Sequence, residues 1–179
     1  MKFRSIGVIT KPNAESARET LLSLLGYLNG KGCKVILDEQ ITDDLNQHGF
    51  KRADRNTIGA ECDLAIVVGG DGTILNAVRS LVHANVPLLG INVGRLGFLA
   101  DISPDALEKS LDDILDGSYH EDQRLLLEMK VNRDDKIIFE GDAFNNVVVH
   151  ISDVARMIEY ETRIDDEIFN HQPPDGIVD

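Results

Sequence analysis

The segment that decides the fold reads Asp63-Leu64-Ala65-Ile66-Val67-Val68-Gly69-Gly70-Asp71-Gly72-Thr73. After the first residue, five consecutive apolar residues predict a strand that is buried on both faces, as in a parallel sheet. A helical pattern runs from residue 73 to residue 84, so the glycines lie in a strand-to-helix turn. Glycines let a backbone approach a ligand closely, and the start of a helix favours phosphate. The segment therefore predicts a phosphate-binding turn formed by Gly70, Asp71, Gly72 and Thr73.

This turn differs from the common nucleotide-binding loops. It is not a GxGxxG motif, and no Lys follows the glycines as in a Walker A loop. An ordinary turn, in which the glycines serve geometry and Asp71 is only solvated, explains the same residues about equally well.

The pattern on both sides of the turn predicts an α/β domain. Strands are expected at 3–10, 34–37, 63–68 and 86–92, and helices at 14–29, 73–84 and 103–116. Residues 39–60 are polar and give no clear assignment. Because strands alternate with helices, we expect βαβ units around a parallel sheet, in a Rossmann-like nucleotide-binding domain over residues 1–122.

The pattern changes after residue 122. Strands are expected at 125–132, 136–140, 143–150 and 156–164, joined by short polar turns, with Asp165-Asp166 suited to a hairpin tip. These residues predict the beginning of an antiparallel all-β domain at 123–179. So few strands leave open sheet edges, and we therefore expect the chain to be a fragment with an incomplete second domain.

Composition excludes several classes of protein. The 31 Asp and Glu against 18 Lys and Arg give a net charge of −13, which argues against nucleic-acid binding. The longest apolar stretch has five residues, far below the ~20 of a membrane span. Cys33 and Cys62 are too few for a disulfide framework, which favours the cytoplasm. The histidines lack metal-ligand spacing, so no metal-ligating residues are predicted.

Two motifs together resemble the NAD kinase family. Gly69–Thr73 continues as Ile74-Leu75-Asn76-Ala77, and further along the chain reads Gly90-Ile91-Asn92-Val93-Gly94-Arg95-Leu96-Gly97-Phe98-Leu99-Ala100-Asp101. The GGDG turn alone is shared with diacylglycerol, sphingosine and 6-phosphofructo kinases, whereas the second block is similar to the NAD kinases within this GGDGT superfamily. The resemblance continues through residues 145–150, 156–159 and 175–176.

The resemblance implies an enzyme that transfers the γ-phosphoryl group of ATP to an alcohol. The acceptor would be the 2′-hydroxyl of the adenosine ribose of NAD, and the products would be NADP and ADP. Asp71 matches the catalytic base of the family, which accepts the proton of this hydroxyl. Because the chain is acidic and has no P-loop Lys, we expect a divalent ion such as Mg²⁺ to neutralise the phosphates.

Further binding residues follow from the same resemblance. Asn92, Phe98 and Leu99 would line the nucleotide pocket, and Phe98 would offer a face for adenine. Plain core packing is the alternative for Phe98, since phenylalanine is so often buried.

Four residues near the end of the chain complete the expected site. Asn145 matches an Asn that contacts the NAD adenosine, and Asn146 stands where the family has a carboxylate, so one acceptor oxygen replaces two. Arg156 matches a basic nucleotide-contacting residue. Asp175 matches an Asp that contacts nucleotide, in many members across a subunit boundary, which favours a homo-oligomer such as a dimer or tetramer. Pro173 stands where the family commonly has Arg.

Two other functions stay open. A GGDG kinase for lipids or sugars would carry Asn-Glu where this chain has Asn76-Ala77, together with membrane-facing features. A nucleotide-binding module without turnover is favoured by Asn146 and Pro173. The expected partners are NAD and ATP, with no nucleic acid and no membrane.

Overall fold

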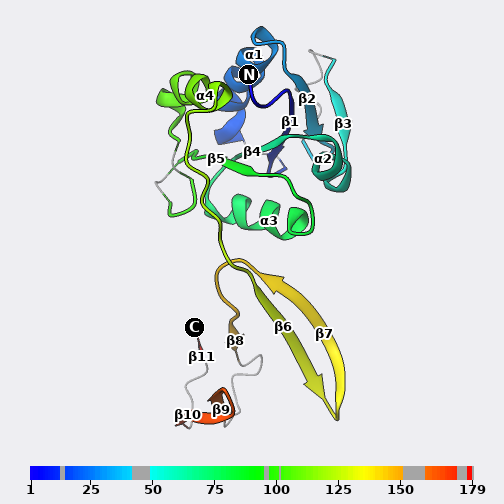
Figure 1. The fold of residues 1–179 in the computed structure, drawn as a ribbon, viewed down its shortest axis with the longest axis vertical. Helices are drawn as coiled ribbons and strands as arrows, with labels where there is room; N and C mark the ends of the chain where they lie inside the picture. The colour runs from blue at the N-terminus through cyan, green and yellow to red at the C-terminus, as the bar shows by residue number, and fades with distance from the viewer. Residues whose placement is uncertain are drawn as a thin grey trace. The chain divides into compact units, whose positions relative to one another are not determined.

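The computed structural model describes residues 1–12, 15–41, 49–94, 97–100, 102–150, 160–172 and 177–178. The chain divides into two compact units, Met1–Gln123 and Arg124–Asp179. Each unit is described by itself below (Figure 1).

A five-stranded parallel sheet with the order β3-β2-β1-β4-β5 forms the centre of the first unit (Figure 1). Its strands are β1 (Ser5–Thr10), β2 (Lys34–Asp38), β3 (Lys51–Ala53), β4 (Leu64–Val68) and β5 (Leu88–Ile91). In chain order, β2 and β3 lie on one side of β1, and β4 and β5 follow on its other side. The strand order therefore reverses between β1 and β4, which makes their carboxyl ends the topological switch point of the sheet.

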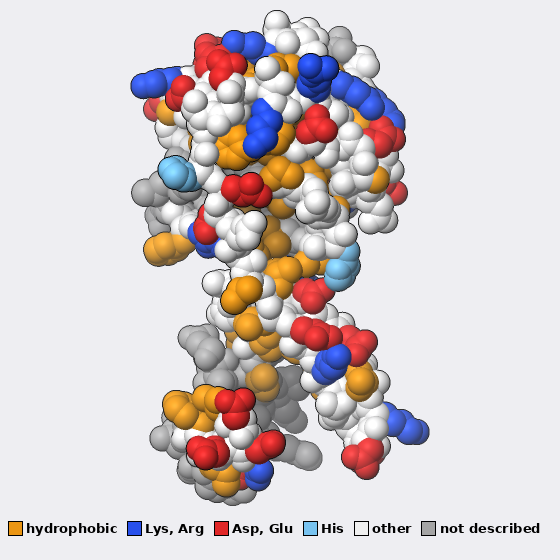
Figure 2. All heavy atoms as spheres, viewed as in Figure 1, with side chains coloured by type: hydrophobic (Ala, Val, Ile, Leu, Met, Phe, Trp, Pro, Cys, Tyr) orange, Lys and Arg blue, Asp and Glu red, His pale blue; other side chains and the backbone are white. Residues whose placement is uncertain are grey.

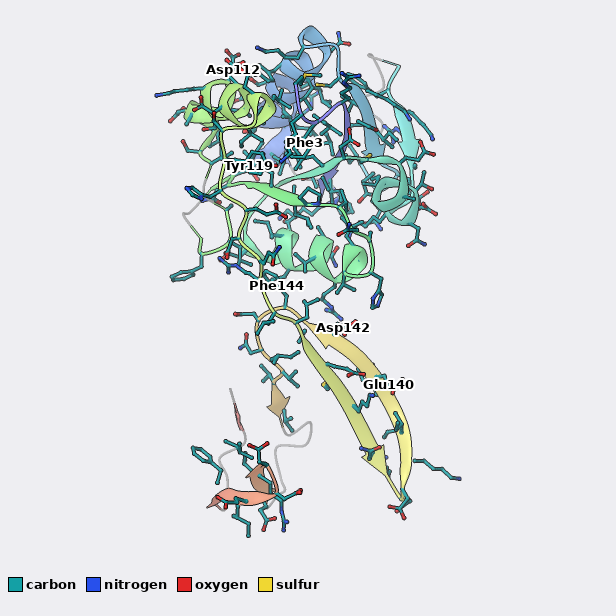
Figure 3. The ribbon with its side chains drawn as sticks, viewed as in Figure 1. Phe3, Asp112, Tyr119, Glu140, Asp142 and Phe144 are labelled. Carbon is teal, nitrogen blue, oxygen red and sulfur yellow. The ribbon has the colours of Figure 1, made fainter. Side chains whose placement is uncertain are left out.

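Helices cover both faces of this sheet (Figure 1). On one face lie α1 (Arg18–Gly30) and α4 (Leu107–Asp116), whose buried leucines join Ile6, Val8 and Ile66 in one core cluster. Short 3-10 helices at Glu15–Ala17 and Pro104–Ala106 lead into them. The first strand is also covered at its start, where the rings of Phe3 and Tyr119 lie 5.6 Å apart (Figure 3).

The other face carries α2 (Arg55–Glu61) and α3 (Asp71–Leu81). The helix α2 lies very close to the sheet, because a Cβ on Gly7 would lie only 2.3 Å from Cγ2 of Ile58. Asp54 caps the start of α2 by accepting the N–H of Thr57 at 2.7 Å, and the buried Cys62 follows its last turn. Among the described residues, no helix is both long and apolar enough to cross a membrane.

The predicted α/β architecture is confirmed, but several details differ. The helix predicted to begin at residue 73 begins at Asp71, since the carbonyl of Gly70 already accepts the N–H groups of Thr73 and Ile74. The unassigned region 39–60 contains β3 and α2. Ile58 is the buried residue of α2, so this short helix has no apolar periodicity to reveal it.

The second unit is antiparallel, as predicted. Hydrogen bonds pair β6 (Leu127–Arg133) with β7 (Lys136–Ala143), β9 (Tyr160–Ile164) with β10 (Glu167–Gln172), and β8 (Val149–His150) with β11 (Ile177–Val178). The strand predicted over 143–150 is wrong in length, because Ala143 ends β7 and only the last two residues of the range form a separate strand. Both long hairpins turn through an Asp-Asp pair with positive φ at each residue, as type I′ turns require.

The β6–β7 hairpin has two different faces, because side chains alternate along each strand. Leu127, Val131 and Phe139 lie on one face and are exposed. The opposite face is charged, and Nζ of Lys130 lies 2.8 Å from Glu128 and 3.8 Å from Glu140. Acidic and basic side chains are also intermixed on the face of the first unit that Figure 2 shows.

Candidate functional site

The candidate site lies at the carboxyl ends of β1, β4 and β5. Thr10 ends β1, and its hydroxyl donates to the carbonyl of Val68 at 2.8 Å. Gly69 follows β4, and its N–H donates to the carbonyl of Ile91 at the end of β5, at 3.0 Å. These bonds tie together the strand ends at the switch point, where doubly wound sheets bind their ligands.

The glycine turn is packed on one side and open on the other. A Cβ on Gly69 would lie 2.6 Å from Oγ1 of Thr73, so the absence of a side chain lets α3 begin directly above the strand. A Cβ on Gly70 or Gly72 would meet no described atom within 4 Å. The backbone at these two glycines therefore faces open space, next to the N-terminal end of an 11-residue helix. The partial positive charge of a helix N-terminus suits phosphate oxygens.

Asp71 is the first residue of α3, and its carboxylate joins two motifs that are distant in sequence. Oδ2 accepts the backbone N–H of Phe98 at 2.9 Å, and Oδ1 accepts that of Leu99 at 3.1 Å. The structure therefore brings the glycine turn into contact with the second sequence motif, which contains Phe98 and Leu99. Asp71 itself is half-buried.

The other predicted pocket residues of the first unit follow β5. The side chain of Phe98 is 93% exposed, which rules out core packing for this residue. Leu99 is half-buried. Asn92 comes directly after β5 and is buried, and its N–H donates to the carbonyl of Ile102 at 2.8 Å. Val93 then donates to the carbonyl of Gly69 at 3.4 Å, so Asn92 stands beside the glycine turn.

The remaining predicted residues lie further along the chain. Asn145 and Asn146 are exposed in the second unit, between β7 and β8. Arg156 and Asp175 lie outside the described residues.

A buried ion pair at the end of β2 was not predicted. Nε of Arg55 donates to Oδ2 of Asp38 at 2.8 Å, and the two side chains are 12% and 1% exposed. Nη1 of the same arginine donates to Oδ1 of Asn76 at 2.6 Å and to Oγ of Ser80 at 2.8 Å. The pair thus connects β2, α2 and α3. The position of Asp38 after an apolar run was the available signal, but Arg55 lies in the segment that could not be assigned.

The donor set at the turn fits one kind of metal binding. In the described parts of the chain, no three His, Cys, Asp or Glu side chains are grouped to hold a metal ion. The glycine turn offers the carboxylate of Asp71, which already accepts two N–H groups. Mg²⁺ in nucleotide sites is held by one or two carboxylates together with substrate phosphates. These residues therefore fit an ion that arrives on a nucleotide, rather than an ion enclosed by protein ligands.

Comparisons with known proteins agree on one family. The model of the ATP-NAD kinase N-terminal domain matches residues 6–119. NAD kinases from Chromohalobacter salexigens and Pseudomonas syringae pv. syringae are each 44% identical to this chain, over 176 and 177 residues. These matches cover 98% and 99% of this chain but 60% of each relative, so the chain spans about three fifths of the length of these curated relatives. Among solved structures, yeast NADH kinase complexed with NADH is similar in fold, with a TM-score of 0.82 at 22% identity, over 98% of this chain and 57% of that one.

Proposed function

This chain belongs to the NAD kinase family, and from that membership we propose that the full-length protein transfers the γ-phosphoryl group of ATP to the 2′-hydroxyl of the adenosine ribose of NAD. The products are NADP and ADP. The names of relatives that are 44% identical support this reaction. The observation that carries it is the position of Asp71, a half-buried residue at the start of α3 beside the open side of the glycine turn.

Asp71 is the general base of the proposed reaction. A ribose hydroxyl is barely acidic, so a carboxylate that accepts its proton helps as the new P–O bond forms. A carboxylate offers about four acceptor positions, and Phe98 and Leu99 use two of those on Asp71. The remaining positions are available to the hydroxyl of the substrate.

The turn and the downstream segment bind the nucleotides in this proposal. The backbone of Gly70 and Gly72 approaches the phosphates, and Thr73 holds the turn closed by packing on Gly69. The exposed ring of Phe98 offers a stacking surface for adenine, with Leu99 and Asn92 beside it. Mg²⁺, when bound with ATP, neutralises charge on the phosphate oxygens.

The second unit contributes the contacts to adenosine through Asn145 and Asn146, and Arg156 and Asp175 bind nucleotide. These roles rest on the match to the family motifs. The division into a nucleotide-binding domain (1–122) and the start of a β-rich domain (123–179) rests on the change of sequence pattern after residue 122. Asn146 supplies one acceptor oxygen where the family has two, which weakens its hold on ribose hydroxyls.

Association and location belong to the same proposal. The exposed apolar face of the β6–β7 hairpin supports a homo-oligomer. The free thiols of Cys33 and Cys62 support a cytoplasmic location.

A coupled assay of NADP formation with the full-length protein tests the function. Asp71→Asn lowers kcat by about 10²–10⁴-fold, because an amide cannot accept the hydroxyl proton. The matched control is Asp63→Asn, since Asp63 also accepts two backbone N–H groups, from Arg4 and Ser5, but lies at the start of β4. The control variant keeps the kcat of the wild type.

Three other outcomes would contradict different parts of the proposal. A kcat of Asp71→Asn within a few-fold of the wild type would remove Asp71 from the base role. Binding of ATP and NAD without NADP formation would indicate a nucleotide-binding module. Transfer from ATP to a lipid or sugar, but not to NAD, would indicate another kinase of the GGDGT superfamily.

A further inference from the structure

The carboxylate of Asp71 lies against the backbone of a segment 26 to 28 residues further along the chain, Gly97-Phe98-Leu99. Each of its oxygens accepts one N–H group of this segment, at 2.9 Å and 3.1 Å. Two bonds to two different oxygens fix the rotation of a carboxylate about its Cβ–Cγ bond, which a single bond does not do. The segment therefore determines where the free acceptor positions of Asp71 point.

Gly97 makes this arrangement possible. A Cβ added to Gly97 would lie 2.1 Å from Oδ1, 2.6 Å from Cγ and 2.8 Å from Oδ2 of Asp71. The three nearest atoms all belong to one carboxyl group, so any side chain at this position would occupy the place of the carboxylate. Because that group ends a short, rotatable side chain, the carboxylate would turn away while the surrounding backbone stays in place.

We propose that Gly97 is a positioning residue for the general base. Its bare Cα, together with the N–H groups of Phe98 and Leu99, holds the Asp71 carboxylate in the orientation that receives the 2′-hydroxyl proton. This inference rests on the proposed function of Asp71 and extends it to a residue that itself touches neither substrate nor the reacting atoms.

A double-mutant cycle in the full-length protein tests the proposal, with Gly97→Ala, Asp71→Ala and the double variant. Gly97→Ala alone lowers kcat by about 10²-fold, the usual effect of a displacement of about 1 Å in a catalytic group. The KM for NAD changes by less than about threefold, since binding is not what the Cβ disturbs. In the Asp71→Ala background, Gly97→Ala changes neither kcat nor Tm further, because the carboxyl group that the Cβ would meet is gone.

Gly94→Ala is the matched control on the same loop. Gly94 has a φ of +111°, and a Cβ there would meet no described atom within 4 Å. The cost of this substitution is backbone strain, so the drop in Tm is the same with Asp71 and with Ala at position 71.

Two results would overturn the proposal: a kcat of Gly97→Ala equal to that of the wild type, or equal losses from Gly97→Ala in both backgrounds. Failure of the proposed function is recognised separately, as a wild type that forms no NADP or an Asp71→Ala variant that turns over normally. The Tm part of the cycle tests the contact between Gly97 and Asp71 even then, since it needs no activity.

Discussion

At the scale of single residues, the ion pair between Asp38 and Arg55 is notable because both charges are largely removed from water. Removing two charges from water is costly, and mutual attraction offsets this cost only where the remaining polar atoms are also satisfied. Here Asp38 also accepts the N–H of Gln40 at 3.1 Å, and Arg55 also donates to Asn76 and Ser80. The pair therefore holds α3, and with it the residue that begins that helix, to the end of β2.

Breaking this pair is expected to destabilise the fold strongly. Arg55→Met leaves the Asp38 carboxylate buried without its cation, which lowers the free energy of unfolding by about 3–5 kcal/mol. Lys34→Met is the control, because the pair of Lys34 with Glu61, at 3.2 Å, is exposed and is worth at most about 1 kcal/mol. Urea unfolding of both variants gives the comparison. Equal losses in the two variants would mean that Arg55 contributes no more than a surface charge.

The sequence predicted those site residues that can be recognised from the pattern of their immediate neighbours in the chain. Gly70, Asp71 and Gly72 stand together between an apolar run and a helix, so strand, turn and helix could be inferred from adjacent residues. The bonds from Asp71 to Phe98 and Leu99 could not, because nothing in either motif specifies the loop geometry that joins them. Arg55 was missed for the same reason, since its partners come from two other elements, β2 and α3.

At the scale of elements, two glycines on opposite faces of the sheet have opposite roles. Gly7 lies in the middle of β1 beneath α2, where a Cβ would lie 2.3 Å from Ile58 and 3.4 Å from Sγ of Cys62. Gly26 lies on the exposed side of α1, where a Cβ would meet no described atom within 4 Å.

Alanine at these two positions is expected to change stability in opposite directions. Gly7→Ala overpacks the interface between β1 and α2 and lowers the free energy of unfolding by about 1–3 kcal/mol. Gly26→Ala reduces the entropy lost on forming the helix, and therefore raises the free energy of unfolding by about 0.5–1 kcal/mol. Chemical denaturation of both variants measures the difference. A Gly7→Ala variant as stable as the wild type would show that α2 can move off the sheet without cost.

The start of β4 is linked to the start of β1 by one carboxylate. Oδ2 of Asp63 accepts the N–H groups of Arg4 and Ser5 at 2.9 Å and 3.0 Å. These bonds stabilise the charged form and hold the pKa of Asp63 below its usual value. A carboxyl whose pKa is lower in the folded state stabilises the fold above the pKa of the unfolded chain, about 3.9. That contribution is lost as the pH falls through the lower, folded-state pKa.

Asp63→Asn is therefore expected to lower Tm at pH 7 and to have a smaller effect in acid. The wild type loses the advantage of its ionised carboxylate as it becomes protonated, whereas the amide does not titrate. Thermal unfolding followed by circular dichroism, in steps from pH 7 down to about pH 3, measures the gap between the two curves. A gap that stays constant with pH would assign the effect to lost packing instead.

Elements were predictable where a long pattern repeats. The leucines of α1 and the apolar run of β4 mark these two elements clearly, because each buries a full stripe or both faces. The helix α2 is seven residues long and buries Ile58, which is too little for any periodicity. The start of α3 was set two residues too late, because Asp71 and Gly72 are helical here through the cap at Gly70 rather than through their own propensity.

At the scale of the whole molecule, the two units differ in how they bury apolar surface. Every buried apolar side chain that the structure describes lies between Phe3 and Leu115, inside the first unit. Most exposed large apolar side chains belong to the second unit, among them Leu127, Val131 and Phe139. The first unit thus contains a complete core, which is the main requirement for independent folding.

We therefore expect residues 1–123 alone to fold and to unfold in one cooperative transition. Coincident urea curves from circular dichroism and tyrosine fluorescence would establish this, with the 179-residue chain measured in parallel. Leu111→Ala in the fragment provides the control, since this fully buried residue should cost about 2–5 kcal/mol wherever the core is formed. A fragment that unfolds without cooperativity would make the first unit dependent on the second.

Because Cys62 is buried, its reactivity reports local unfolding in which α2 detaches from the sheet. Burial raises the pKa of this thiol, and only the thiolate attacks thiol reagents, so Cys62 stays unreactive while α2 is docked. The half-buried Cys33 should be modified first, and Cys62 only in molecules whose second helix has briefly detached. The modification rate of Cys62 then measures the population of that open form in the native protein, without denaturant. In Gly7→Ala, which presses on the same helix, Cys62 should be modified faster while the rate at Cys33 is unchanged.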